Sequence, residues 1–322
     1  MEGTSSVDAQ APGVNTETSD CDGIVLSSKP LEPMVEDCCG LGCTPCVFDI
    51  YEQEVVAWKK QCGFLKYQDP TTHCDKQKFL DKAKYTSFQL ISLSAISPDT
   101  NIFRFNIPNG GSLHLNPGQH LILRGKFGGR TLTRQYTPIS GVSERGYFDV
   151  IIKLYPHGKM SRFVKTWNVG DTIEWRGPFG EFLYKANSYR RVVMIAGGTG
   201  ITPMMQVIPQ ILDNDEDETF VRLIYSNRDY DGVLLKSRLD SRKDMWNFTV
   251  LYVLTKASQD VCAVKYGDNI LFGCINKELL EKELKVADGK QLVLICGTKS
   301  FDRDVIAIVK EMGLSENSYF RF

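Results

Sequence analysis

The stretch that decides the fold reads Ile195-Ala-Gly-Gly-Thr-Gly-Ile-Thr-Pro203. It follows a short apolar run typical of a buried strand and leads into a helical pattern over residues 203–212. Glycines at such a turn let backbone N–H groups approach a phosphate at the positive end of the helix. The stretch is not a P-loop, because no Gly-Lys-Ser/Thr follows, and it lacks the last glycine of G-x-G-x-x-G. From these residues alone, a plain glycine turn between a strand and a helix remains open.

Towards the C-terminus, apolar runs alternate with helical patterns. The runs cover residues 192–196, 220–226, 248–255 and 292–296, and the helical patterns cover residues 203–212, 233–243, 277–284 and 301–312. Strand–helix alternation of this kind predicts an α/β domain with a doubly wound parallel sheet, which we place at residues 188–322.

Towards the N-terminus, the pattern over residues 79–187 is that of β structure. Short runs rich in β-branched and aromatic residues are separated by the turn signals Asn109-Gly-Gly, Asn116-Pro-Gly and Gly128-Gly. Many short strands with such turns predict a small β-barrel, interrupted by one helical stretch at residues 160–166.

The first 78 residues differ in composition from the rest. Residues 1–36 read as a disordered acidic leader, 37–62 as a cysteine-rich module and 63–78 as a linker. The whole chain has 322 residues and a net charge of −1, which excludes a globally basic nucleic-acid binder. No signal peptide and no apolar stretch of about 18 residues is seen. We therefore expect an intracellular, cytoplasmic protein without a membrane anchor.

Two motifs in the barrel region suit an anionic ligand. Arg134-Gln-Tyr-Thr-Pro-Ile-Ser140 offers a planar guanidinium and an aromatic ring, and Gly158-Lys-Met-Ser161 opens the only helical stretch of the barrel. An ordinary strand end and a plain helix cap at Ser161 are the alternatives for each motif taken by itself.

Taken together, these motifs resemble the ferredoxin-reductase superfamily, and most closely its cytochrome b5 reductase branch. That branch carries R-x-Y-T-x-x-S, G-K-M-S and G-P-x-G in the barrel and G-G-T-G-I-T-P in the second domain. This chain matches at Arg134–Ser140, Gly158–Ser161, Gly177–Gly180 and Gly197–Pro203, and it adds Cys296-Gly297 and a closing aromatic residue, Phe322. The resemblance covers roughly residues 85–322.

The resemblance implies an FAD site in the barrel and an NADH site in the second domain. Arg134 and the helix start at Gly158 would hold the FAD pyrophosphate, and Tyr136 would pack beside the flavin. Thr137, near flavin N5, and Cys296, beside the nicotinamide, are the implied catalytic residues. The expected cofactor-binding set, with Asp231 added for the ribose, is Arg134, Tyr136, Thr137, Ser140, Val150, Ile152, Lys153, Tyr155, Gly158, Lys159, Met160, Ser161, Gly197, Gly198, Thr199, Gly200, Thr202, Pro203, Asp231, Cys296 and Gly297. His120 also matches a family position, with a core role at least as favoured.

Two departures from the family pattern bear on the nicotinamide nucleotide. The branch has C-G-P-P where this chain reads Cys296-Gly-Thr-Lys299, so the loop that clamps the nicotinamide is altered. The expected acidic residue for the ribose falls at Gly232, with Asp231 adjacent. We expect NADH rather than NADPH, because Asp229 and Asp231 would repel a 2′-phosphate, although Arg228 could attract one.

The cysteine segment resembles the short oxidoreductase-like N-terminal module found before some reductases of this branch. Cys38, Cys39, Cys43 and Cys46 could hold a metal ion, and their spacing also fits the start of a [2Fe–2S] pattern. Too few residues are available for a ferredoxin domain, and residues 47–60 have helical spacing. Thiols without a metal are the leading alternative.

The resemblance implies an oxidoreductase that takes hydride from NADH onto FAD and passes electrons singly to an acidic haem protein such as cytochrome b5. Residues 115–191 carry thirteen bases against five acids, including Arg124, Lys126, Arg130, Lys165 and Arg176, which suits an acidic partner. The competing hypothesis is a reductase-fold binding or regulatory protein with little turnover, recruited through its cysteine module.

Overall fold

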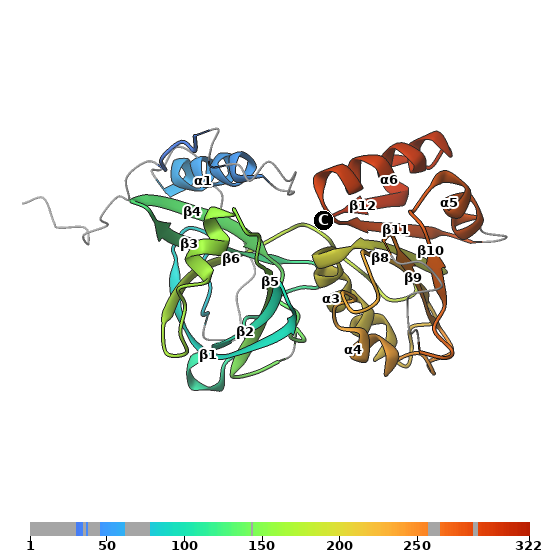
Figure 1. Cartoon of the computed structure of the whole chain (residues 1–322), viewed down its shortest axis with the longest axis horizontal. Helices are drawn as coiled ribbons and strands as arrows, with labels where there is room; N and C mark the ends of the chain where they lie inside the picture. The colour runs from blue at the N-terminus through green and yellow to red at the C-terminus, as the bar shows by residue number, and fades with distance from the viewer. Residues whose placement is uncertain are drawn as a thin grey trace, which may run out of the picture.

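The computed structural model describes residues 30–34, 37, 46–61, 78–142, 144–256, 265–285 and 289–322. Figure 1 shows a barrel and an α/β domain side by side, with an N-terminal helix lying against the barrel. That helix, α1, spans Val47–Gln61, as its apolar spacing predicts. Within the described residues, no helix is both long and apolar enough to cross a bilayer.

The barrel consists of six antiparallel strands in the order β4-β3-β6-β1-β2-β5. A bridge between Pro138 and Val150 joins the chain after β4 to the far edge of the sheet, which closes the barrel. Its strands are β1 Thr86–Ser97, β2 Thr100–Asn106, β3 His120–Phe127, β4 Arg130–Tyr136, β5 Tyr147–Lys153 and β6 Thr172–Phe179, with the 3₁₀ turn η2 Pro108–Gly110 and the helix α2 Lys159–Val164.

Aromatic side chains fill the barrel. The rings of Phe105 and Phe148 are stacked with centroids 5.1 Å apart, and Trp175 meets both of them edge to face. Phe88 and Phe103 complete this fully buried group. Alternation of these large residues with polar ones is what turns one face of each strand inward.

The α/β domain is a six-stranded parallel sheet in the order β10-β9-β8-β7-β11-β12. Its strands are β7 Arg191–Gly197, β8 Phe220–Asn227, β9 Phe248–Leu254, β10 Ile270–Phe272, β11 Gln291–Cys296 and β12 Tyr319–Arg321. Its helical segments are η3 Gly198–Gly200, α3 Ile201–Leu212, α4 Lys236–Asp240, α5 Lys277–Leu284, α6 Lys299–Glu311 and η4 Glu316–Ser318.

Strand residues in this domain are apolar on both sides because helices cover both faces. Val192 and Met194 belong to the core that includes α3, whereas Val193 and Ile195 belong to the core that includes α5 and α6. The order of the strands reverses between β7 and β11, so their carboxyl ends form the crevice where such sheets bind ligands. The predicted doubly wound sheet is therefore confirmed.

The structure differs from the sequence expectation in some elements. The helix expected over residues 233–243 is reduced to the five residues of α4, because Leu235 has a left-handed backbone with φ of 57°. Strands β4 and β6 were not expected as strands, since polar and charged residues mask the pattern of β4, and a Gly-Pro pair and two charged residues mask that of β6.

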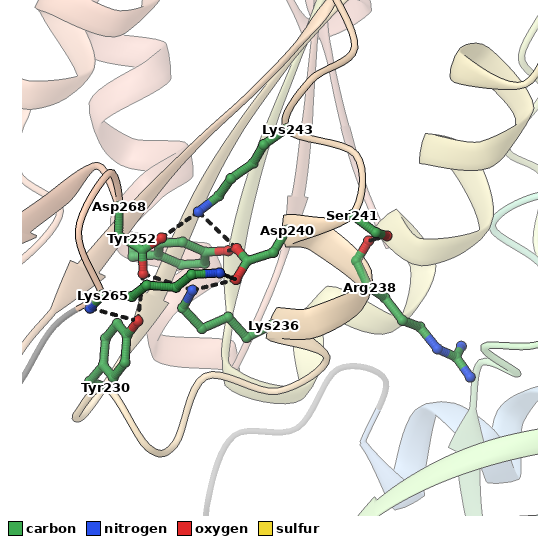
Figure 2. A network of polar contacts seen from close by, with 9 residues as sticks. All are labelled: Tyr230, Lys236, Arg238, Asp240, Ser241, Lys243, Tyr252, Lys265 and Asp268. Atoms are coloured by element: carbon green, nitrogen blue, oxygen red, sulfur yellow. Dashed lines mark hydrogen bonds and ion pairs between the residues drawn. The ribbon is translucent and has the colours of Figure 1, made fainter.

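An ionic network stabilises the α/β domain around α4 (Figure 2). Asp268, whose side chain is 1% exposed, forms ion pairs with Lys236 at 2.7 Å and with Lys243, and it accepts a hydrogen bond from Tyr230 at 2.5 Å. Asp240 pairs with the same two lysines, at 2.7 and 2.8 Å. Each buried charge thus has a partner of opposite sign, which is the condition for burying it without a large cost.

One buried side chain joins the two domains. Gln206 on α3 accepts a hydrogen bond from the N–H of Gly118 and donates one to the carbonyl of Pro138, both at 2.7 Å. Gly118 and Pro138 belong to the barrel, so this amide ties α3 to it, beside the apolar core that both domains share.

Candidate active site

A cleft of about 400 Å³ lies between the barrel and the carboxyl ends of β7 and β11. Fifteen of the expected cofactor-binding residues line it: Arg134, Tyr136, Thr137, Lys153, Tyr155, Gly158, Lys159, Met160, Ser161, Thr199, Gly200, Thr202, Pro203, Cys296 and Gly297. Residues from both domains therefore meet in one place, as the resemblance implies.

Two cations stand at the barrel side of the cleft. Arg134 lies near the end of β4 and donates through Nη1 to the carbonyl of Thr133 at 2.7 Å and through Nη2 to the carbonyl of Asp37 at 3.1 Å. Lys159 begins α2, and its Nζ lies 2.8 Å from Oδ1 of Asp37. An arginine and a lysine that both contact one residue, the first at its carbonyl and the second at its carboxylate, are suited to binding a phosphate.

The segment before α2 is shaped by Gly158 and Ser161. Ser161 is buried, and its Oγ accepts a hydrogen bond from the N–H of Tyr155 at 2.9 Å. A Cβ at Gly158 would lie 2.9 Å from that same Oγ, so only glycine fits. Gly158 is itself the N-cap of α2, so the alternative that Ser161 caps this helix is wrong.

On the α/β side, the glycine turn packs directly against the end of β11. A Cβ on Gly200 would lie 2.1 Å from the carbonyl oxygen of Cys296, which no side chain could occupy. A Cβ on Gly198, where φ is +53°, would instead meet nothing within 4 Å. The turn therefore fits closely to its own domain and leaves open space on the other side, as a dinucleotide site requires.

Cys296 is a neutral thiol. Burial raises its pKa, and the negative charge of Asp302 acts in the same direction. Asp302 is completely buried in the first turn of α6, and burial raises its pKa to about 6. A thiol held in this way suits packing against a nicotinamide ring better than acid–base chemistry.

His120 also lines the cleft and is neutral. Burial lowers its pKa to about 4, and its ring stacks on Phe179 with centroids 6.1 Å apart. Its Nε2 is buried and has no hydrogen-bond partner among the described residues. The expected core histidine bonded to backbone is thus not seen at that atom.

Six expected residues do not line the cleft. Val150 and Ile152 point into the barrel core, and Ile151 between them faces the cleft instead, because side chains alternate along β5. Ser140 accepts a hydrogen bond from the N–H of Asp149 at 3.2 Å, a link within the barrel. Gly197 and Gly198 precede the lining residues Thr199 and Gly200, and Asp231 is exposed beyond the end of β8.

Sequence reasoning missed other lining residues. Gln53 on α1 and Gln135 on β4 contact each other at 3.3 Å at the rim of the cleft. Phe320 and Phe322, at the carboxyl end, line it from the other side; the closing aromatic residue was the available signal for them. Nothing in the sequence pattern pointed to Gln53.

The expected metal ligands are largely outside the described residues. Cys38, Cys39 and Cys43 lie there, and Cys46 precedes α1 with its N–H donating to Asp49 at 2.7 Å. A metal site in this segment stays a prediction.

Three family models match this chain. They are "Oxidoreductase-like protein, N-terminal" at residues 20–66, "Oxidoreductase FAD-binding domain" at 87–184 and "Oxidoreductase NAD-binding domain" at 194–306. The cleft therefore lies between an FAD-binding and an NAD-binding domain. Its open glycine turn, its paired cations and its aromatic lining fit these two cofactors.

Relatives of similar length align with nearly the whole chain. The NADH-cytochrome b5 reductase-like protein of Mus musculus is 37% identical over 92% of this chain and 96% of its own length, and that of Homo sapiens is 36% identical over 95% and 98%. Among solved structures, the cytochrome b5 reductase domain of Ulva prolifera nitrate reductase is 27% identical, with a TM-score of 0.66, and covers 76% of this chain and 100% of that domain. With this fold, this cleft and these relatives, the chain belongs to the NADH-cytochrome b5 reductase-like family.

Proposed function

We propose that this chain passes the electrons it takes from NADH one at a time to a haem protein of the cytochrome b5 type. The family membership makes the chain an NADH-dependent flavoprotein reductase with FAD, rather than the binding protein without turnover that was its rival. The identity of the acceptor and the one-electron step are the proposal.

The observation that carries the proposal is the meeting of both motif sets in one cleft. Tyr136 and Thr137 line it from the barrel, and Gly200 and Cys296 line it from the α/β domain. FAD supplies the redox chemistry when bound, and the protein supplies binding and orientation. A cleft with residues of both domains on its walls suits the stacking of a flavin against a nicotinamide.

Each group of residues has a role in this arrangement. Arg134 and Lys159 would bind the phosphates of FAD, at the end of the cleft next to α1. The thiol of Cys296 is neutral, so it would pack beside the nicotinamide without placing a negative charge next to the ring. The neutral His120 would line the wall without adding positive charge.

The acceptor would dock on an exposed basic patch that we call the α2 patch: Lys126, Arg162 and Lys165. Helix α2 packs on β3, where a Cβ at Gly125 would lie 2.3 Å from the ring of Phe163, so these three cations share one surface. Arg124 and Arg176 are less suited, because they pair with Glu174 at 2.6 Å and Glu54 at 3.2 Å. The sequence count therefore overstated the free positive charge, and the α2 patch is a part of it in which three exposed cations lie together.

Stopped-flow kinetics with purified cytochrome b5 tests this proposal. We expect replacement of all three cations of the α2 patch by alanine to lower the rate of cytochrome b5 reduction about tenfold at low salt, and much less at high salt. Reduction of the flavin by NADH should be unchanged. The matched control is Lys282→Ala, on α5 of the other domain. Fast flavin reduction with no reduction of cytochrome b5 by the unmutated protein would contradict the acceptor and leave the reductase intact.

A further inference from the structure

The carboxylate of Asp37 occupies the centre of a group of cations at the rim of the cleft. Its Oδ1 lies 2.8 Å from Nζ of Lys159 and 3.4 Å from Nη1 of Arg130, and its backbone carbonyl lies 3.1 Å from Nη2 of Arg134. Its Oδ2 accepts a hydrogen bond from the N–H of Met34 at 2.9 Å. The residue is only 9% exposed. We call Arg130, Arg134 and Lys159 the three-cation site.

The three-cation site has more positive charge than Asp37 can balance. One carboxylate faces three cations, and the hydrogen bond from Lys159 holds the pKa of Asp37 below its ordinary value. Two of the cations are those assigned above to the phosphates of FAD, whereas Arg130 lies outside the family motif. An excess of positive charge next to a cleft is suited to a ligand with more negative charge than one carboxylate.

The N-terminal part of the chain reaches this site through a second contact on the barrel. Glu54 on α1 pairs with the buried Arg176 at 3.2 Å and accepts a hydrogen bond from the hydroxyl of Tyr85 at 2.8 Å. Gln53, its neighbour, lines the cleft. Asp37 is thus held at the three-cation site by a segment that is itself bound to the barrel.

We propose that Asp37 is an internal ligand of the three-cation site and competes with the pyrophosphate of FAD for it. The proposal rests on the assignment of Arg134 and Lys159 to the phosphates. A carboxylate and a pyrophosphate cannot share the same donors without strong repulsion between their charges. Docking of Asp37 and binding of FAD therefore oppose each other, and by reciprocity bound FAD weakens the hold of the barrel on this N-terminal segment.

Titration of the full-length apoprotein with two flavins tests the proposal. FAD carries the pyrophosphate, and riboflavin lacks it. We expect Asp37→Asn to bind FAD about tenfold more tightly than the unmutated protein does, because a neutral amide forms no ion pairs with Arg130 and Lys159. Both proteins should bind riboflavin equally well. The control Asp49→Asn removes an exposed carboxylate of the same segment, whose partner is the N–H of Cys46. It should leave both affinities unchanged.

The other outcomes overturn the proposal. An unchanged or weaker affinity for FAD in Asp37→Asn would mean that Asp37 orders the cations for the phosphate instead of competing with it. Tighter binding of both flavins would mean that the substitution merely loosens the segment. Arg134→Ala, measured in the unmutated protein and in Asp37→Asn, tests separately whether Arg134 binds the phosphate of FAD. If Arg134→Ala leaves FAD affinity unchanged in both backgrounds, the phosphate assignment itself is wrong.

Discussion

Two clusters of cations and aspartates in this molecule differ in their balance of charge. Around α4, Lys236 and Lys243 are matched by Asp240 and Asp268 (Figure 2). At the rim of the cleft, three cations face Asp37 alone.

The difference teaches how to tell a stabilising cluster from a binding one. In the α4 cluster two buried carboxylates balance two lysines within the fold, so removal of one aspartate leaves two lysines facing one carboxylate. In the three-cation site, positive charge remains in excess after Asp37 is counted, so an anion from outside can bind there favourably. The predictions below concern substitutions in one cluster or the other and, last, in the loop before α4. They are given from the largest expected effect to the smallest.

The largest effect is expected in the α4 cluster. Asp268→Asn should lower the free energy of unfolding by about 3–5 kcal/mol, because Lys236 and Lys243 lose a partner that is 1% exposed. Denaturant titration followed by circular dichroism measures this loss. Asp244→Asn, at an exposed neighbouring carboxylate, is the control and should change the value by no more than about 0.5 kcal/mol. A loss below about 1 kcal/mol in Asp268→Asn would show that the cluster adds little to stability.

Arg134→Ala should weaken FAD binding by about 1.5–3 kcal/mol, or roughly tenfold or more, because a charge-assisted contact to phosphate is lost. The flavin content of the purified protein and a titration of the apoprotein measure it. Arg162→Ala serves as the control, since Arg162 is exposed and lies 5.8 Å from the ring of Phe127 rather than in the cleft. If Arg134→Ala purifies with full flavin content, Arg134 does not hold the phosphate.

The α4 cluster should also make stability depend on acid pH. Burial alone would raise the pKa of Asp268, but hydrogen bonds from Lys236, Lys243 and Tyr230 outweigh it and lower the pKa to about 2. A carboxyl group with a lower pKa in the folded state stabilises the fold above its unfolded pKa of about 3.8 and loses that contribution as the pH falls towards 2. Melting temperatures between pH 5 and pH 2 should fall less steeply in Asp268→Asn. An identical slope in both proteins would contradict the assignment.

The smallest effect concerns the loop between β8 and α4, where Arg228 and Asp231 are exposed. We expect kcat/KM to be at least roughly tenfold higher with NADH than with NADPH, a difference of about 1.4 kcal/mol. The reason is that the carboxylates of Asp229 and Asp231 repel a 2′-phosphate more than Arg228 attracts it. Asp231→Ala should narrow the difference and Arg228→Ala should widen it. Steady-state kinetics with both nucleotides measures the ratio of the two kcat/KM values. Equal values for the unmutated enzyme would indicate that Arg228 faces the ribose.

The sequence predicted those parts of the molecule that depend on local patterns. The apolar runs of the parallel sheet and the spacing of α1 are local, and so are the glycine turn at Gly197 and the Arg134 motif. The elements that failed depend on context: α4 is cut short by the backbone of Leu235, β4 is a strand through its pairing with β3, and β6 through its pairing with β3 and β1. Tertiary pairing overrides weak local preference in such segments.

The site residues that the sequence did not predict also depend on tertiary structure. Val150 and Ile152 were expected from the resemblance as backbone contacts of the cofactor, which stays a prediction; the alternation of β5 places the side chain of Ile151, which was not expected, at the cleft. Asp37 reaches Arg130 and Lys159 across 93 and 122 residues of sequence, a distance at which no periodic pattern carries information.

The amide of Gln206 has a mechanical consequence for the two domains. Its oxygen and its nitrogen both bind the barrel, and the residue is 3% exposed, so pulling the domains apart would break two buried hydrogen bonds at once. The amide therefore helps to set the spacing between the two walls of the cleft, because Gly200 is the N-cap of the helix that carries Gln206 and Pro138 follows Thr137 on the barrel wall.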